Sequence, residues 1–139
     1  MTPPSGVRQT VVCAGVPIDA LTRQRAADDL LTLAAAETLA SAGIAARVVD
    51  LYSIKPLDLA TLRTAATETG RVLTVEDHWP EGGLGEAVFS ALAEAGLGVK
   101  GELLAVRHMP DSATPEQELA EAGIDSVAIV AAAKRLTAA

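Results

Sequence analysis

Aromatic side chains, cysteines and basic clusters are all scarce in this sequence of 139 residues. Phe, Trp and Tyr occur once each, so the core must be aliphatic, which suits helices packed closely on a sheet. The single cysteine, Cys13, excludes a disulfide framework and a cysteine-rich metal site, and we expect it to be a small buried hydrophobe. A formal net charge of −7 without a basic cluster argues against nucleic-acid binding.

Long apolar runs are also missing. Charged residues interrupt each apolar stretch well before the ~20 residues that a membrane span needs. Residues 1–10 have no apolar core behind a basic start, so we predict no secretory signal and a cytoplasmic protein. The length fits one domain. We place this domain at residues 8–139, after a flexible lead-in at residues 1–7 that is rich in proline, serine and glycine.

The hydrophobic pattern predicts strands that alternate with helices. Short apolar runs predict strands at 10–14, 45–51, 71–76 and 103–106. Apolar positions at helical spacing, together with caps and glycine stops, predict helices from Asp19 or Thr22 to about 41, at 59–69, from the glycines at 82–85 to about 96, at 115–121 and at 125–136. Asp58 and Asp125 are the expected N-caps of two of them. This alternation indicates an α/β domain with a mostly parallel sheet.

Gly82-Gly83-Leu84-Gly85, between the third strand and the third helix, is the most conspicuous motif. Glycines at such a place let backbone N–H groups approach an anion at the positive end of a helix. Val88 stands where a dinucleotide fingerprint needs a small residue, and the neighbouring glutamates would repel a phosphate. We therefore interpret the motif as a structural turn, with a free-standing module that binds a small anion as the alternative.

A group of polar residues, Glu76-Asp77-His78, follows the third strand. Ligands of α/β proteins bind at the carboxyl ends of parallel strands, and histidine titrates near neutrality. Adjacent residues on a strand point to opposite faces, however, so a turn or a subunit contact is favoured over catalysis. Trp79 is either an interface anchor or a residue folded over the sheet edge. The interface candidates are Asp77, His78, Trp79, Gly82 and Gly83, and no catalytic, cofactor-binding or metal-binding residue is assigned.

Four stretches carry a resemblance to a known family. They are Arg-Val-Val-Asp-Leu at 47–51, Ser-Ile-Lys-Pro-Leu-Asp at 53–58, Leu-Thr-Val-Glu-Asp-His at 73–78 and Gly-Gly-Leu-Gly-Glu-Ala-Val at 82–88. In this order and spacing they closely resemble the C-terminal domain of transketolase. Trp79-Pro80 is similar instead to the β subunit of 2-oxoacid dehydrogenase E1, which shares this domain and remains the alternative. Residues 18–29 are an addition relative to the family.

The resemblance implies a three-layer α/β/α domain with a mostly parallel, five-stranded sheet. It implies the C-terminal part or small subunit of a transferase of the pentose phosphate pathway, which moves a two-carbon ketol unit between sugar phosphates. In that family, thiamine diphosphate and Mg or Ca lie between the other two domains, so we expect this chain alone to bind neither and to be inactive. The expected partner is the N-terminal and pyrimidine-binding portion, in a homo- or hetero-oligomer, with no nucleic acid and no membrane.

Overall fold

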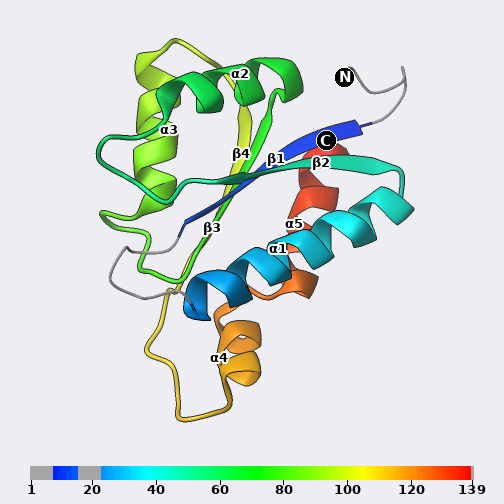
Figure 1. Cartoon of the computed structure of the whole chain (residues 1–139), viewed down its shortest axis with the longest axis vertical. Helices are drawn as coiled ribbons and strands as arrows, with labels where there is room; N and C mark the ends of the chain where they lie inside the picture. The colour runs from blue at the N-terminus through cyan, green and yellow to red at the C-terminus, as the bar shows by residue number, and fades with distance from the viewer. Residues whose placement is uncertain (1–7, 16–22, 139) are drawn as a thin grey trace.

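The computed structural model describes the backbone of residues 8–15 and 23–138 and the side chains of residues 32–138. The elements are β1 (Arg8–Gly15), α1 (Arg23–Ser41), β2 (Ile44–Asp50), α2 (Leu59–Thr69), β3 (Arg71–Glu76), α3 (Leu84–Glu94), β4 (Lys100–Leu104), α4 (Pro115–Ala122) and α5 (Ser126–Ala138). The alternation of strands and helices predicted from the pattern is confirmed (Figure 1). The lead-in at 1–7 and the cap candidates Asp19 and Thr22 lie outside the described residues, while residues 23–29 of the additional segment form the first turns of α1.

The strands form one sheet in the order β2-β1-β3-β4, and each neighbouring pair is parallel. Residue 12 of β1 is paired with Val48 on one side and with Leu73 on the other. Four strands are found within residues 8–15 and 23–138, so the fifth strand implied by the family resemblance is not among the described residues. The α/β class is confirmed. In the described part of the chain, no helix is both long enough and apolar enough to cross a membrane.

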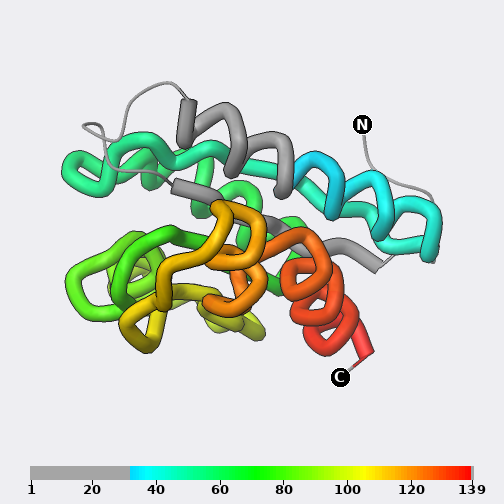
Figure 2. The backbone as a smooth tube through the Cα atoms, turned by 90° about the horizontal axis from the view of Figure 1, so that it is seen from below, coloured from blue at the N-terminus to red at the C-terminus, as the bar shows by residue number. Residues whose placement is uncertain are grey.

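Helices cover both faces of this sheet. In Figure 1, α2 and α3 lie on one side of the strands and α1 and α5 on the other. Side chains of β3 alternate between these faces: Leu73 and Val75 pack with α1 and α5, whereas Val72 packs with α2 and α3. Thr74 and Glu76 share the face of Val72 by the same two-residue period. The view from below shows α4, in orange, nearest the viewer (Figure 2).

Both cores are aliphatic, as the composition predicts. The core on the α1 and α5 side includes Ala35, Leu39, Ile129, Ala132, Ala133 and Leu136. The core on the α2 and α3 side includes Leu51, Leu62, Ala65, Ala66, Leu84, Val88 and Leu92. Buried alanines let the helix backbones approach the sheet and one another closely, so the scarcity of aromatic rings leaves well-filled layers.

A residue directly before the helix caps each of α2, α4 and α5. Asp58 accepts a hydrogen bond from the backbone N–H of Thr61 at 3.0 Å, and Asp125 accepts one from Ala128 at 2.8 Å. Both predicted caps are confirmed. Thr114 and Gln117 form a reciprocal capping box at the start of α4, with Pro115 in its first turn.

β4 begins three residues before the predicted strand at 103–106 and ends at Leu104. Residues 100–102 were not predicted as part of the strand, and Gly101, a residue with a low strand propensity, lies among them. A Cβ atom at Gly101 would lie 2.3 Å from Cε1 of Phe89, so glycine is there because the Phe89 ring packs on its backbone. A glycine inside a strand often marks such a close approach.

Candidate functional site

The centre of the candidate site is Glu76, the last residue of β3, whose side chain turns back to the start of α3. One carboxylate oxygen accepts a hydrogen bond from the N–H of Leu84 at 2.6 Å, and the other accepts one from Gly85 at 3.0 Å. Glu76 is 3% exposed. The first N–H groups of a helix have no partner within the helix, and they favour negative charge. Glu76 therefore caps α3 from the preceding strand.

Burial raises the pKa of the Glu76 carboxyl above its ordinary value. The N–H groups of Gly85 and Leu84 stabilise the ionised form and act in the opposite direction, but the cost of burying the charge is larger. The folded protein thus holds a proton on Glu76 more readily than the unfolded chain does. This carboxyl is part of the protein interior and does not open onto the solvent.

The glycines of the motif are explained by close packing around this cap. A Cβ atom at Gly83 would lie 2.1 Å from Oε2 of Glu76, and one at Gly85 would lie 2.2 Å from Cδ1 of Leu103. Gly82 has a φ of 72°, in the left-handed region that favours glycine. Its N–H donates to the carboxylate of Glu86, in the first turn of α3.

The anion at the positive end of α3 is thus supplied by the chain itself. The N–H groups of Leu84 and Gly85 bind a carboxylate of the same chain, which supports the interpretation of the motif as a structural turn. The alternative, an external small anion at Gly82–Gly85, loses its donors at Leu84 and Gly85, because Glu76 already occupies both.

Three of the interface candidates, Asp77, His78 and Trp79, follow Glu76 and are all exposed. Nδ1 of His78 lies 2.6 Å from the backbone oxygen of Trp79. The backbone oxygen of His78 accepts a hydrogen bond from Val106 at 2.9 Å, so this loop runs beside the segment after β4. Trp79 is 43% exposed. An interface role for these residues, Gly82 and Gly83 stays a prediction.

A cavity of about 220 Å³ lies between the carboxyl ends of β3 and β4 and helix α4. Asp77 lines this cavity together with His108 and Glu118, whereas His78 is not among its lining residues. Nε2 of His108 lies 3.5 Å from Oε1 of Glu121, so the neighbour of this histidine is a carboxylate of α4. Asp77 and His78 both follow the end of β3, and of the two only Asp77 lines this cavity.

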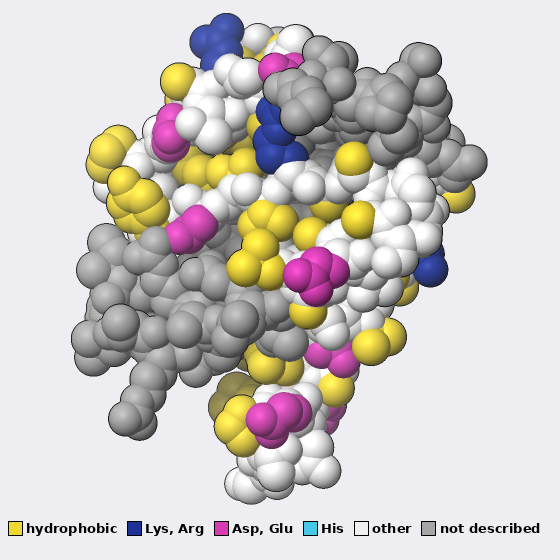
Figure 3. Space-filling view, turned by 45° about the vertical axis from the view of Figure 1, so that its right-hand side comes forward, with side chains coloured by type: hydrophobic (Ala, Val, Ile, Leu, Met, Phe, Trp, Pro, Cys, Tyr) yellow, Lys and Arg dark blue, Asp and Glu magenta, His cyan; other side chains and the backbone are white. Residues whose placement is uncertain are grey.

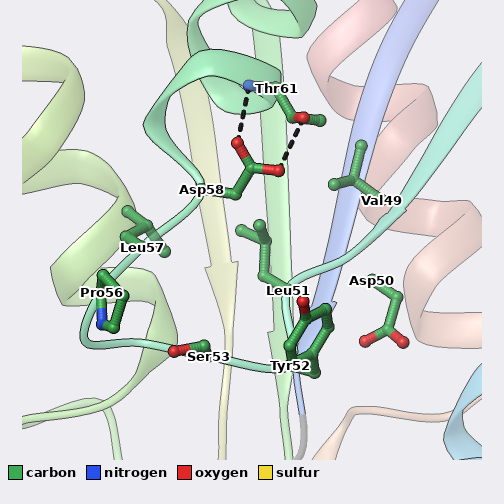
Figure 4. Close-up of a pocket in the computed structure, with 9 residues that line it drawn as sticks. All are labelled: Val49, Asp50, Leu51, Tyr52, Ser53, Pro56, Leu57, Asp58 and Thr61. Atoms are coloured by element: carbon green, nitrogen blue, oxygen red, sulfur yellow. Dashed lines mark hydrogen bonds between the residues drawn. The ribbon is translucent and has the colours of Figure 1, made fainter.

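A larger cavity, of about 380 Å³, lies at the carboxyl end of β2 (Figure 4). Its lining includes Asp50, Tyr52, Ser53 and Asp58. Both carboxylate oxygens of Asp58 are engaged by Thr61, one by its backbone N–H and the other by its hydroxyl at 2.8 Å. These two hydrogen bonds hold the pKa of Asp58 below its ordinary value. Asp58 thus caps α2. Because its pKa is lowered and both of its oxygens are hydrogen-bonded, it is a poor general base for this cavity.

Three further residues were considered as candidates in the sequence: Arg71, Lys55 and Cys13. Nε of Arg71 donates to the backbone oxygen of Leu136 at 3.0 Å, so Arg71 joins the start of β3 to the end of α5 instead of lying free in solvent. Lys55 is exposed. The side chain of Cys13 lies outside the described side chains, although its backbone belongs to β1.

Sequence reasoning missed the cavity at α4. Its walls come from three separate segments, after β3, after β4 and along α4, and none of these carries a recognisable ligand motif. The one local signal was Thr114-Pro115-Glu116-Gln117, a pattern typical of a capped helix start. That pattern locates the helix but does not indicate a cavity beside it.

Comparison with known proteins gives consistent matches. The family model described as "Transketolase, C-terminal domain" matches residues 31–129. Transketolase of Mus musculus is 50% identical over 105 residues, which cover 75% of this chain and 17% of that protein. Transketolase of Homo sapiens is 48% identical over 106 residues, with the same coverages. The chain thus spans about 17% of the length of these curated relatives.

Solved structures agree with the sequence matches. A structure described as a split gene transketolase, an inactive beta4 tetramer, has a TM-score of 0.79 and 33% identity, and covers 96% of this chain and 40% of that one. Transketolase from Campylobacter jejuni has a TM-score of 0.52 and 16% identity, which supports the fold alone.

The described residues do not fit the thiamine diphosphate and divalent metal implied by this resemblance. Among the described side chains, those of residues 32–138, no group of three or more His, Cys, Asp or Glu is arranged to hold a metal ion. A diphosphate also needs donors, and the N–H groups of Leu84 and Gly85 are used by Glu76. We derive no catalytic step through this cofactor on this chain.

Proposed function

Because this chain belongs to the transketolase family, as its C-terminal domain, we propose that it is the C-terminal part or small subunit of a thiamine diphosphate-dependent enzyme. The enzyme would transfer a two-carbon ketol unit between sugar phosphates, in the cytoplasm. The domain would support dimerisation and brace the parts that bind cofactor and substrate. The family match over residues 31–129 carries this proposal.

Three features of the chain support a bracing role over a catalytic one. The carboxyl edge of the sheet, where α/β proteins usually bind ligands, is occupied at α3 by the buried carboxylate of Glu76. A net charge of −7 would repel both a diphosphate and a sugar phosphate. Exposed apolar side chains, including Tyr52 and Trp79, follow strands at this edge and suit contact with another polypeptide.

The relatives reported above favour transketolase over the 2-oxoacid dehydrogenase alternative raised by Trp79-Pro80. The chain spans about 17% of those relatives, so most of the enzyme would lie outside these 139 residues. An oligomer stabilises its folded members by mass action, so a docked domain of this kind would hold a shared active site together.

Reconstitution tests this proposal. The isolated chain should give no heat of binding when titrated with thiamine diphosphate and Mg²⁺, and no turnover of xylulose 5-phosphate. Mixed with the polypeptide that carries the rest of the enzyme, it should restore activity on xylulose 5-phosphate and not on pyruvate. Tight cofactor binding or turnover by the isolated chain would overturn the proposal, and so would failure to associate with that polypeptide.

A further inference from the structure

The cavity at α4 combines apolar walls with carboxylates. Val106 and Leu119 are half-buried and Ile124 is buried, and all three line it. The carboxylates of Asp77 and Glu118 and the imidazole of His108 belong to the same lining, which contains neither lysine nor arginine. Figure 3 shows the end of the molecule that contains α4, at the bottom, with apolar and acidic side chains side by side and Lys and Arg side chains higher up.

The walls of this cavity are held in place by contacts within the chain. The hydrogen bond from Val106 to the backbone oxygen of His78 joins the segments after β4 and β3. The capping box of Thr114 closes the start of α4, and Nε2 of His108 lies 3.5 Å from Oε1 of Glu121 near the other end of this helix. The cavity is thus lined by residues of three segments that only the folded chain brings together.

Size and charge restrict the occupant. A volume of about 220 Å³ lies below the range of about 300–1,000 Å³ typical of small-molecule sites. It suits a single inserted side chain. Long basic side chains pack an apolar stem against an apolar wall and keep the charged head at polar groups. A carboxylate beside such a head forms a charge-assisted hydrogen bond.

We propose that this cavity receives a lysine or arginine side chain of the polypeptide that carries the thiamine-binding part of the enzyme. The stem packs along Val106, Leu119 and Ile124, and the head meets the carboxylate of Glu118. A second copy of this face is disfavoured, because it would bring Glu118 of both copies together. The proposal rests on the proposed function for the identity of the partner, but the chemistry of the cavity is testable without that partner.

Two matched pairs of variants test the site. Glu118→Lys reverses the charge in the cavity, and its control Glu116→Lys places a lysine in the same first turn of α4 but outside the lining. Both carry the same unfavourable charge near the helix N-terminus, so that cost cancels. Ala122→Leu fills the cavity, and its control Ala120→Leu lies on the same helix, is exposed and does not line it. Circular dichroism and thermal unfolding check that all four fold.

Binding to the partner polypeptide is measured by calorimetry for the wild type and the four variants. We expect Glu118→Lys and Ala122→Leu to weaken association about tenfold or more, and the controls to change it less than about threefold. The first variant brings like charges together, and the second fills the space that the inserted side chain needs. Wild-type affinity in both cavity variants overturns the inference and leaves the proposed function standing.

A second measurement does not need the partner. Titration of the isolated chain with n-butylguanidinium chloride, followed by NMR, should shift the amides of Val106, Glu118 and Ala122 in the wild type and not in Ala122→Leu. The absence of saturable shifts at these amides overturns the inference. When the wild type fails to associate with the partner polypeptide, the proposed function falls, and this titration alone decides the chemistry of the cavity.

Discussion

The carboxylate of Glu76 and the backbone N–H of Leu84 lie 2.6 Å apart, and their hydrogen bond joins the last residue of β3 to the first residue of α3. This bond converts a motif that looks like a ligand loop into part of the protein core. It also makes the stability of the β3–α3 connection depend on one buried ionisable group, which yields the first two predictions.

Gly83→Ala should destabilise the protein by about 2 kcal/mol, because its Cβ would lie on the carboxylate of Glu76 and overpacking of this kind costs 1–3 kcal/mol. The clash disappears when Glu76 is truncated. In a Glu76→Ala background, Gly83→Ala should therefore cost much less, and urea unfolding of the four proteins in this cycle measures the difference. An equal loss of unfolding free energy in both backgrounds would show that the Glu76 carboxylate is not what excludes a side chain at residue 83.

The pH dependence of stability should carry the signature of Glu76. Its pKa is raised in the folded state, so its contribution to stability is fully present below the ordinary glutamate pKa and is lost as the pH rises through the raised value. We expect the free energy of unfolding of the wild type, measured relative to Glu76→Gln, to fall as the pH rises above the ordinary pKa of glutamate.

Unfolding by urea at several pH values measures this difference. Glu94→Gln, an exposed position on α3, is the control and should follow the wild type across the same range. A wild type that gains stability over Glu76→Gln as the pH rises would contradict the predicted direction.

Thr74→Val should stabilise the protein by about 1 kcal/mol. The hydroxyl of Thr74 is fully buried and has no hydrogen-bond partner among the described residues, and an unpaired buried polar group costs about 1–3 kcal/mol. Thr69→Val is the matched control, because the Thr69 hydroxyl donates to the backbone oxygen of Ala65 at 2.9 Å. Thermal unfolding should move the two variants in opposite directions, and a loss of stability in Thr74→Val would refute the assignment.

Trp79→Ala should weaken association with the rest of the enzyme about tenfold or more and leave the fold of the isolated chain intact, since a half-exposed tryptophan is a common interface anchor. Sedimentation or calorimetry with the partner polypeptide measures the affinity. Val127→Ala, which removes another exposed apolar side chain at the start of α5, is the control. An unchanged association constant in Trp79→Ala would remove Trp79 from the interface.

The periodic parts of the chain were predictable from the sequence. Apolar spacing located the helices, and Asp58 and Asp125 marked two helix starts, because a cap acts on the N–H group three residues ahead. β4 was placed too late in the chain, because Gly101 has a low strand propensity and its reason, the ring of Phe89, lies in another element.

The candidate site was only partly predictable, for the same physical reason. The glycines at 82–85 predicted a structural turn, but the reason for them, the carboxylate of Glu76 at the start of α3, is recognisable only when the path from β3 to α3 is known. The cavity at α4 depends on three segments that meet only in the folded chain. Short-range patterns predict elements and caps, whereas contacts between elements need the packed structure.

Two hydrogen bonds hold the loop that contains Asp77, His78 and Trp79. Glu76 ties its start to α3, where the loop finishes, and the backbone oxygen of His78 is bound by Val106. A partner that docks on this loop would therefore meet a segment that is already tied to α3 and to the segment after β4. A substitution of Glu76 removes the hydrogen bond between the start of the loop and α3. It should therefore weaken assembly, although Glu76 itself is buried.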